Sequence, residues 1–159
     1  MKQFYFTLDG FYSKAKAMRK VYDDRFKNPR DAHGERFQWD YWHIPDQYTN
    51  IRTPAYHYFP KGMYEAFHTH LRDWGRSNLG CFDISPPWLT YYVEGCKQEL
   101  HADIPHGPWA FVYSLAPQKV KYSGGETMIL KPEVLSYWKN FDSSRGLEKK
   151  DFLHRIPSK

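Results

Sequence analysis

A histidine and a carboxylate stand one residue apart in the run ELHAD, as His101 and Asp103. Side chains alternate between the two faces of a β-strand, so on a strand these two groups point to the same side while Ala102 turns away. A neutral imidazole and a carboxylate together suit Fe(II), Mn(II) or Zn(II). The spacing therefore predicts two ligands of one metal ion, with a further histidine supplied from elsewhere in the chain.

The other histidines offer weaker patterns. His68 and His70 fall in a stretch expected to be helical, where residues two apart point to different faces, so they are not expected to share an ion. His106 follows Pro105 just beyond the ELHAD run and is expected to lie in a loop near the metal rather than to bind it.

Two helices are expected before the ELHAD run. Apolar residues recur at helical spacing over residues 11–27, and Asn28-Pro29 is expected to end that helix. A second stripe predicts a helix over residues 63–74, with Gly75 as its cap. The aromatic stretch over residues 37–59 is expected to be ordered, irregular chain with short strands.

The second half of the chain has the pattern of a β meander. Short runs rich in β-branched and aromatic residues are bounded by glycine and proline: WLTYYV, QELHAD, PWAFVYSL and ETMILK. Gly124 and Gly125 are expected to form a tight turn before Glu126 and Thr127 open a strand. The polar run NFDSSRGLEKKD is expected to be a surface loop. Helices followed by strands predict an α+β fold in which a helical layer packs on a sandwich or barrel.

Composition limits the classes of function. A chain of 159 residues, 41% hydrophobic and 19% aromatic, can bury one core, which predicts a single domain over residues 1–159. The net charge of +5 is scattered along the chain, which does not favour a nucleic-acid partner. Cys81 and Cys96 have no CxxC spacing, and no run of apolar residues is long enough for a signal peptide or membrane span. We therefore expect a cytoplasmic protein with no membrane association.

The segment YYVEGCKQELHADIPHGPWAFVYSLAPQKVKYSGGETMIL resembles the 2-oxoglutarate and Fe(II)-dependent oxygenase superfamily, in particular its prolyl-hydroxylase-like branch. The resemblance is strongest over residues 88–132. Its features are a tyrosine-bearing strand before the HxD, the HxD itself, a YxL-type strand after it, and a Gly-Gly-Glu-Thr turn into the next strand. Their order and spacing agree with the family together.

The resemblance implies a fold, cofactors and roles for particular residues. Residues 1–85 would form helical and irregular chain packed on a double-stranded β-helix, or jelly-roll, built from residues 86–159. His101 and Asp103 would bind Fe(II), while Tyr92 or its neighbour Tyr91, together with Tyr113, would approach 2-oxoglutarate through their hydroxyl groups. The chain would then use O2 and 2-oxoglutarate to hydroxylate an unidentified small-molecule or peptide substrate.

The chain departs from the family pattern at its end. The family uses a distal histidine as third ligand, followed by an arginine that binds the far carboxylate of 2-oxoglutarate. His154 in DFLHRIPSK is the candidate ligand, but Arg155 is its direct neighbour and no arginine follows at a strand's length. A jelly-roll needs about eight strands, so this one is expected to be incomplete at the C-terminus. A homodimer or a partner chain would cover the open sheet edge.

Three interpretations follow from this departure. The chain is a fragment of an oxygenase, a minimal oxygenase that uses His154, or a non-catalytic jelly-roll that serves as a binding or scaffold module. A cupin-like metal protein that holds zinc or manganese without 2-oxoglutarate is a further alternative, which the carboxylate of the HxD disfavours.

Overall fold

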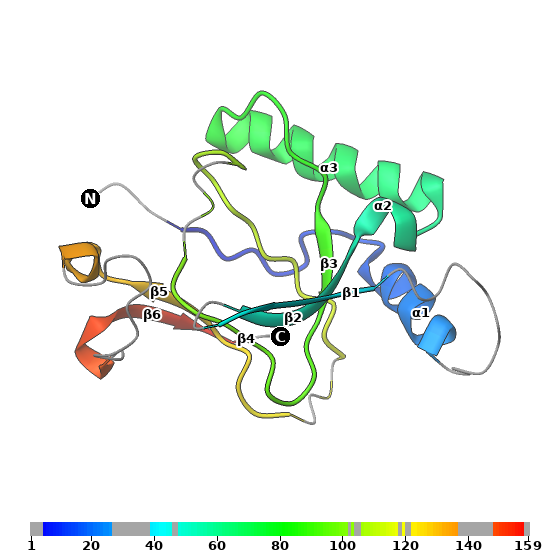
Figure 1. The fold of residues 1–159 in the computed structure, drawn as a ribbon. Coiled ribbons are helices and arrows are strands. Elements are labelled where there is room, and N and C mark those ends of the chain that lie inside the picture. Colours follow the sequence, from blue (N-terminus) through cyan, green and yellow to red (C-terminus); the bar gives the residue numbers. More distant parts are fainter. Residues whose placement is uncertain are drawn as a thin grey trace. The chain divides into compact units, whose positions relative to one another are not determined.

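The structure is a computed structural model, and it divides the chain into two compact units. One unit comprises residues 1–36 and 55–87, and the other comprises residues 37–54 and 88–159. The structure describes residues 5–26, 39–45, 48–101, 103, 106–117, 119, 122–136 and 148–157. Among these, the α-helices belong to the first unit and the strands to the second (Figure 1). The predicted α+β class is confirmed at this level.

The helical unit contains α1 (Ala15–Phe26), α2 (Ala55–Tyr58) and α3 (Lys61–Leu79). Along α3 the buried residues are spaced by four, the interval that places side chains on one face of a helix. The buried apolar residues of this unit are Tyr12, Met18, Ala55, Tyr58, Phe59, Phe67 and Leu71. Aromatic rings therefore supply much of its core.

The first helix is shorter than predicted because its expected first turn is used for packing. α1 begins at Ala15 rather than at Phe11. The Phe11 ring lies edge-on to His70, with centroids 4.8 Å apart, and to Trp74 at 5.9 Å. The backbone carbonyl of Phe11 accepts a hydrogen bond of 2.8 Å from Nε2 of His70. The predicted stop at Asn28-Pro29 lies outside the described residues.

The second helix is longer than predicted, and the assignment of Gly75 as its cap was wrong. α3 continues through Gly75 to Leu79, and Gly80 takes the left-handed conformation, with φ 68°, that commonly ends helices. Gly75 is buried in the helix interior, where an added Cβ would lie 3.6 Å from Cβ of Cys81. Gly75 lets Cys81 pack closely against the helix and does not end it, and sequence spacing does not distinguish these two roles of a glycine.

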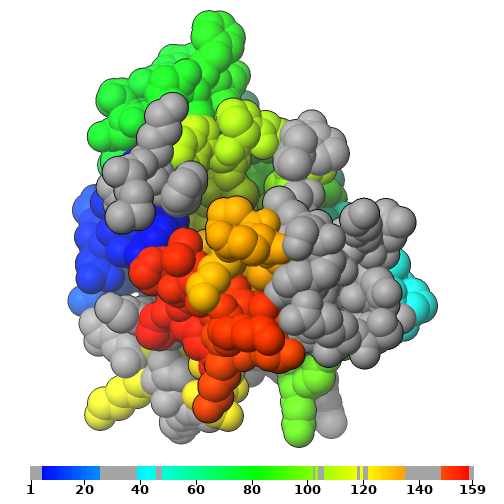
Figure 2. Space-filling model, turned by 90° about the vertical axis from the view of Figure 1, so that its left-hand side faces the viewer, coloured from blue at the N-terminus to red at the C-terminus, as the bar shows by residue number. Residues whose placement is uncertain are grey.

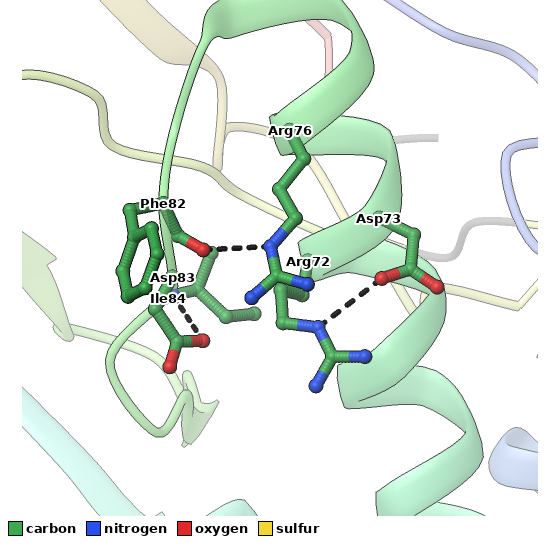
Figure 3. A network of polar contacts seen from close by, with 6 residues as sticks. All are labelled: Arg72, Asp73, Arg76, Phe82, Asp83 and Ile84. Carbon is green, nitrogen blue, oxygen red and sulfur yellow. Dashed lines mark hydrogen bonds and ion pairs between the residues drawn. The ribbon is translucent and has the colours of Figure 1, made fainter.

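The chain that follows α3 is held against the helix by a hydrogen bond. Nε of Arg76 donates a hydrogen bond of 2.7 Å to the carbonyl of Phe82 (Figure 3). Asp83 accepts a hydrogen bond of 2.9 Å from the amide of Ile84, and Arg72 pairs with Asp73 at 3.1 Å in the same view. These contacts are exposed, so they fix the direction of the turn more than they add to stability.

The main sheet is antiparallel and is organised around its central strand. It contains β1 (Asp40–Ile44), β2 (Tyr48–Pro54), β3 (Trp88–Tyr91) and β4 (Lys97–Gln98). β1 pairs with one side of β2, while β3 and β4 pair with successive parts of β2. Residues 92–96 loop out between β3 and β4, opposite the buried Asn50. The predicted meander was wrong here, because WLTYYV and the start of QELHAD do not pair with each other. They lie one after the other along the same strand, β2.

The predicted strand PWAFVYSL is not formed, and its residues have no regular secondary structure. Prolines stand on both sides of the run and cannot donate a ladder hydrogen bond. The hydroxyl of Ser114 also accepts a hydrogen bond of 3.2 Å from the amide of Ala116. Such local bonds compete with sheet pairing, so β propensity alone did not make this segment a strand.

A second, two-stranded sheet joins β5 (Thr127–Leu130) to β6 (Phe152–Ile156). The strand β5 was expected from the run ETMILK, and Gly124 and Gly125 precede it with positive φ angles, as a tight turn requires. The short helix η3 (Pro132–Ser136) follows β5, and the short helix η4 (Lys149–Asp151) precedes β6. In Figure 2 the orange surface of the β5 and η3 region lies next to the red surface of the η4 and β6 region.

The two described sheets are separately paired and are not closed into a barrel. Of the expected surface loop NFDSSRGLEKKD, the first eight residues lie outside the described residues, and the other four are Glu148 and the three residues of η4. None of the described helices has the length and apolar character that crossing a membrane requires.

Candidate functional site

His101 lies just beyond β4, and a backbone contact fixes the chemistry of its ring. The sheet ladder ends at Gln98, so the prediction that His101 and Asp103 lie within a strand was wrong. Nδ1 of His101 is 2.8 Å from the carbonyl oxygen of Glu99. Because a carbonyl can only accept, Nδ1 must carry the proton, and in the neutral ring Nε2 is left with its lone pair free.

The nitrogen with the free lone pair is the one that lies near Asp103. Nε2 of His101 lies 3.9 Å from Oδ1 of Asp103. Two ligands bound about 2.1 Å from one ion at a right angle are about 3 Å apart, so a small rotation of either side chain would let both bind the same ion. Two acceptor groups this close repel each other weakly in water, and a metal ion bound by both would stabilise the pair.

The pair is accessible, and its supporting backbone is held locally. The side chains of His101 and Asp103 are 29% and 51% exposed. Glu99, whose carbonyl orients the imidazole, is itself paired through its carboxylate with Lys97 at 2.6 Å. On the other side, the carbonyl of Asp103 accepts a hydrogen bond of 2.8 Å from the amide of His106. A histidine whose second nitrogen donates to a carbonyl is the common arrangement in metal sites.

The predicted third ligand is on a different sheet. His154 lies in β6, where its backbone pairs with Ile129. Within the part of the chain that the structure describes, no three His, Cys, Asp or Glu side chains gather where they could hold a metal ion. His101 and Asp103 thus lie close together, and the metal-binding roles of His101, Asp103 and His154 stay predictions.

The tyrosines predicted to approach 2-oxoglutarate lie in three different settings. Tyr91 is the last residue of β3, and its ring lies 6.2 Å from that of Trp39. Tyr92 begins the loop after β3 and is 47% exposed. Desolvation, followed by the nearby Cys96 thiol, raises the pKa of Tyr92 to about 12, so its hydroxyl is a stable donor. Tyr113 is half-buried in irregular chain.

The ring of Tyr48, which the HxD motif did not indicate, lies beside the ring of His101. Tyr48, the first residue of β2, pairs with Gln98 across the sheet. Its ring lies edge-on to that of His101, with centroids 6.2 Å apart and an interplanar angle of 79°. Tyr48 is remote from the ELHAD run in sequence, and only the β2–β4 pairing could have placed it here.

Comparisons of the chain with protein-family models, with curated proteins and with solved structures gave no match. Argument about function therefore rests on the residues and their geometry.

Proposed function

We propose that this chain binds Fe(II) through His101 and Asp103 and belongs to the 2-oxoglutarate-dependent oxygenases. The observation that carries the proposal is the free lone pair on Nε2 of His101, a nitrogen that lies 3.9 Å from a carboxylate oxygen. One imidazole and one carboxylate are two of the three protein ligands of a facial triad, so the donor set fits Fe(II). The antiparallel strands are compatible with the jelly-roll that such enzymes use, and we propose that they form part of one.

Bound iron would supply the activation of O2 with 2-oxoglutarate as the reductant. The residues of this chain would do the rest. Glu99 would hold the imidazole in the tautomer that binds metal, and Asp103 would contribute negative charge that favours a divalent ion. Tyr92, with its raised pKa, would stay a hydrogen-bond donor for a carboxylate at every physiological pH. His154 is the proposed third ligand from within the chain.

Manganese binding tests the metal pair directly, because Mn(II) replaces Fe(II) without reacting with O2. The free Mn(II) signal in electron paramagnetic resonance would be titrated with wild-type protein and with the variants His101→Ala and Asp103→Ala. Each variant removes one of two ligands, so affinity should fall by about tenfold or more. His43→Ala is the matched control, because His43 is an exposed histidine of the main sheet that forms a hydrogen bond with Thr49.

Equal Mn(II) affinity in the wild type, in His101→Ala and in Asp103→Ala would overturn the proposal. The pair would then have no part in metal binding, and the chain would fit a non-catalytic binding module better than an oxygenase.

A further inference from the structure

An arginine is held between two indole rings on one face of the main sheet. The guanidinium carbon of Arg52 lies 3.4 Å from the ring centroid of Trp42 and 4.2 Å from that of Trp88. The register explains the arrangement. Trp42 is opposite Asn50 and Trp88 is opposite Pro54, so both indoles are diagonal to Arg52 on its own face.

The stacking leaves the edge of the guanidinium for another partner. Two indoles cover its two faces, and its hydrogen-bond donors all lie in the plane between them. Nε of Arg52 is buried and has no hydrogen-bond partner among the described residues. Burial lowers the pKa of Arg52, while Tyr48 and Asp40 raise it, and the group remains a cation throughout the physiological range. A poorly solvated cation with unused donors has much to gain from a carboxylate.

The same face leads to the candidate metal ligands. Tyr48 shares this face with Arg52, since the two are four residues apart on β2. Tyr48 acts electrostatically on Arg52 and lies edge-on to the His101 ring at 6.2 Å. Tyr48 therefore lies on the same face of β2 as Arg52 and beside the ring of His101, which is just beyond β4.

We propose that Arg52 is a carboxylate-binding group, positioned by Trp42 and Trp88 for an acidic small molecule that lies along Tyr48 toward His101 and Asp103. The carboxylate contact does not depend on the metal, whereas the position beside a metal rests on the proposed function. A carboxylate fits better than a phosphate, because Arg52 is the one cation among the described strand residues of this face. Asp40, directly opposite Arg52 on β1, adds a negative charge that a phosphate, which carries two charges on one group, resists more than a single carboxylate does.

Calorimetric titration of metal-free protein, with chelator present, tests the contact with glutarate and 2-oxoglutarate as probes. Arg52→Gln should weaken binding of both by about tenfold or more, because the paired hydrogen bonds are lost. Arg52→Lys should restore only part of the affinity, since an ammonium cannot form the planar fork. Asp40→Asn should strengthen binding by about twofold or more by removing repulsion. Arg76→Gln, which alters an exposed arginine of α3, is the matched control.

Saturation with Mn(II) then identifies the source of the carboxylate. Arg52 holds the far carboxylate of the keto acid if Arg52→Gln weakens 2-oxoglutarate binding to the Mn(II) protein. It holds a substrate carboxylate if 2-oxoglutarate binding is unchanged and glutarate still binds beside it in an Arg52-dependent way. The proposal would be overturned if glutarate and 2-oxoglutarate bound equally to the wild type and to Arg52→Gln, or did not bind at all, and if Asp40→Asn had no effect. The contact of Arg52 with the two indoles would then be purely structural. A failure of the metal site alone would leave the metal-free result standing.

Discussion

The two ring nitrogens of His101 have different tasks. Nδ1 is committed to the carbonyl of Glu99, so whatever the ring binds must be bound through Nε2, on the side of Asp103. The sequence predicted that His101 and Asp103 share a metal ion, which stays a prediction, but its account of how they are held was wrong. It assumed that a strand would aim them, whereas a hydrogen bond within the chain after β4 does so. Such a bond depends on backbone geometry that residue spacing does not encode.

Tyr48 and Arg52 mark the limit of prediction at this scale. Both lie in the aromatic stretch that was expected to be irregular chain with short strands. Their approach to His101 and to each other follows from β2 pairing with both β1 and β4. Long-range pairing of this kind is set by the whole sheet, and one sequence does not reveal it.

Tyr58 gives a residue-level prediction about alkaline stability. Its side chain is 3% exposed, and desolvation, partly offset by Arg25, raises its pKa to about 12 from the ordinary 10.0. Folding therefore favours the neutral phenol, and this contribution is full below pH 10 and is lost as the pH rises to about 12. Tyr58 alone should therefore lower the free energy of unfolding in urea by about 2 kcal/mol over that interval.

In Tyr58→Phe the alkaline fall should be smaller by about the same amount, while Tyr41→Phe, an exposed control, should behave as the wild type. An equally steep fall in Tyr58→Phe and in the wild type would show that Tyr58 does not titrate with folding.

At the scale of elements, the helices were predicted more accurately than the strands. Helical spacing is local, so the stripe containing Phe67 and Leu71 located α3 correctly. Its end was misplaced because Gly75 packs near Cys81 while Gly80 ends the helix. Strands need partners: only the first residue of QELHAD, Gln98, lies in a strand, and PWAFVYSL forms none.

Two glycines of α3 and its cap should respond oppositely to alanine. Gly80→Ala forces a side chain into the left-handed region and should destabilise the protein by about 1 kcal/mol. Gly62→Ala lies in the first turn, where nothing is within 4 Å of the new Cβ, and should stabilise it by up to about 1 kcal/mol. Urea unfolding measures both variants. Two changes of the same sign would contradict the assigned helix boundaries.

At the scale of the whole molecule, the α+β class followed from helical and strand-like patterns in succession. The finer prediction of a jelly-roll is not confirmed by the described strands. β1 to β4 form an open antiparallel sheet, and β5 and β6 pair only with each other in the described chain. The order of elements along a chain limits its topology, but the pairing of distant strands depends on packing between elements that no local pattern records.

The central claim is that His101 and Asp103 form one side of an iron site that accepts 2-oxoglutarate. An anaerobic titration of the protein with Fe(II), followed by 2-oxoglutarate, tests it most directly, with circular dichroism as the check on folding. The account predicts a weak visible charge-transfer band in the wild type that is lost in Asp103→Ala and kept in His43→Ala. A folded wild-type protein that gives no band with both additions in excess would contradict it.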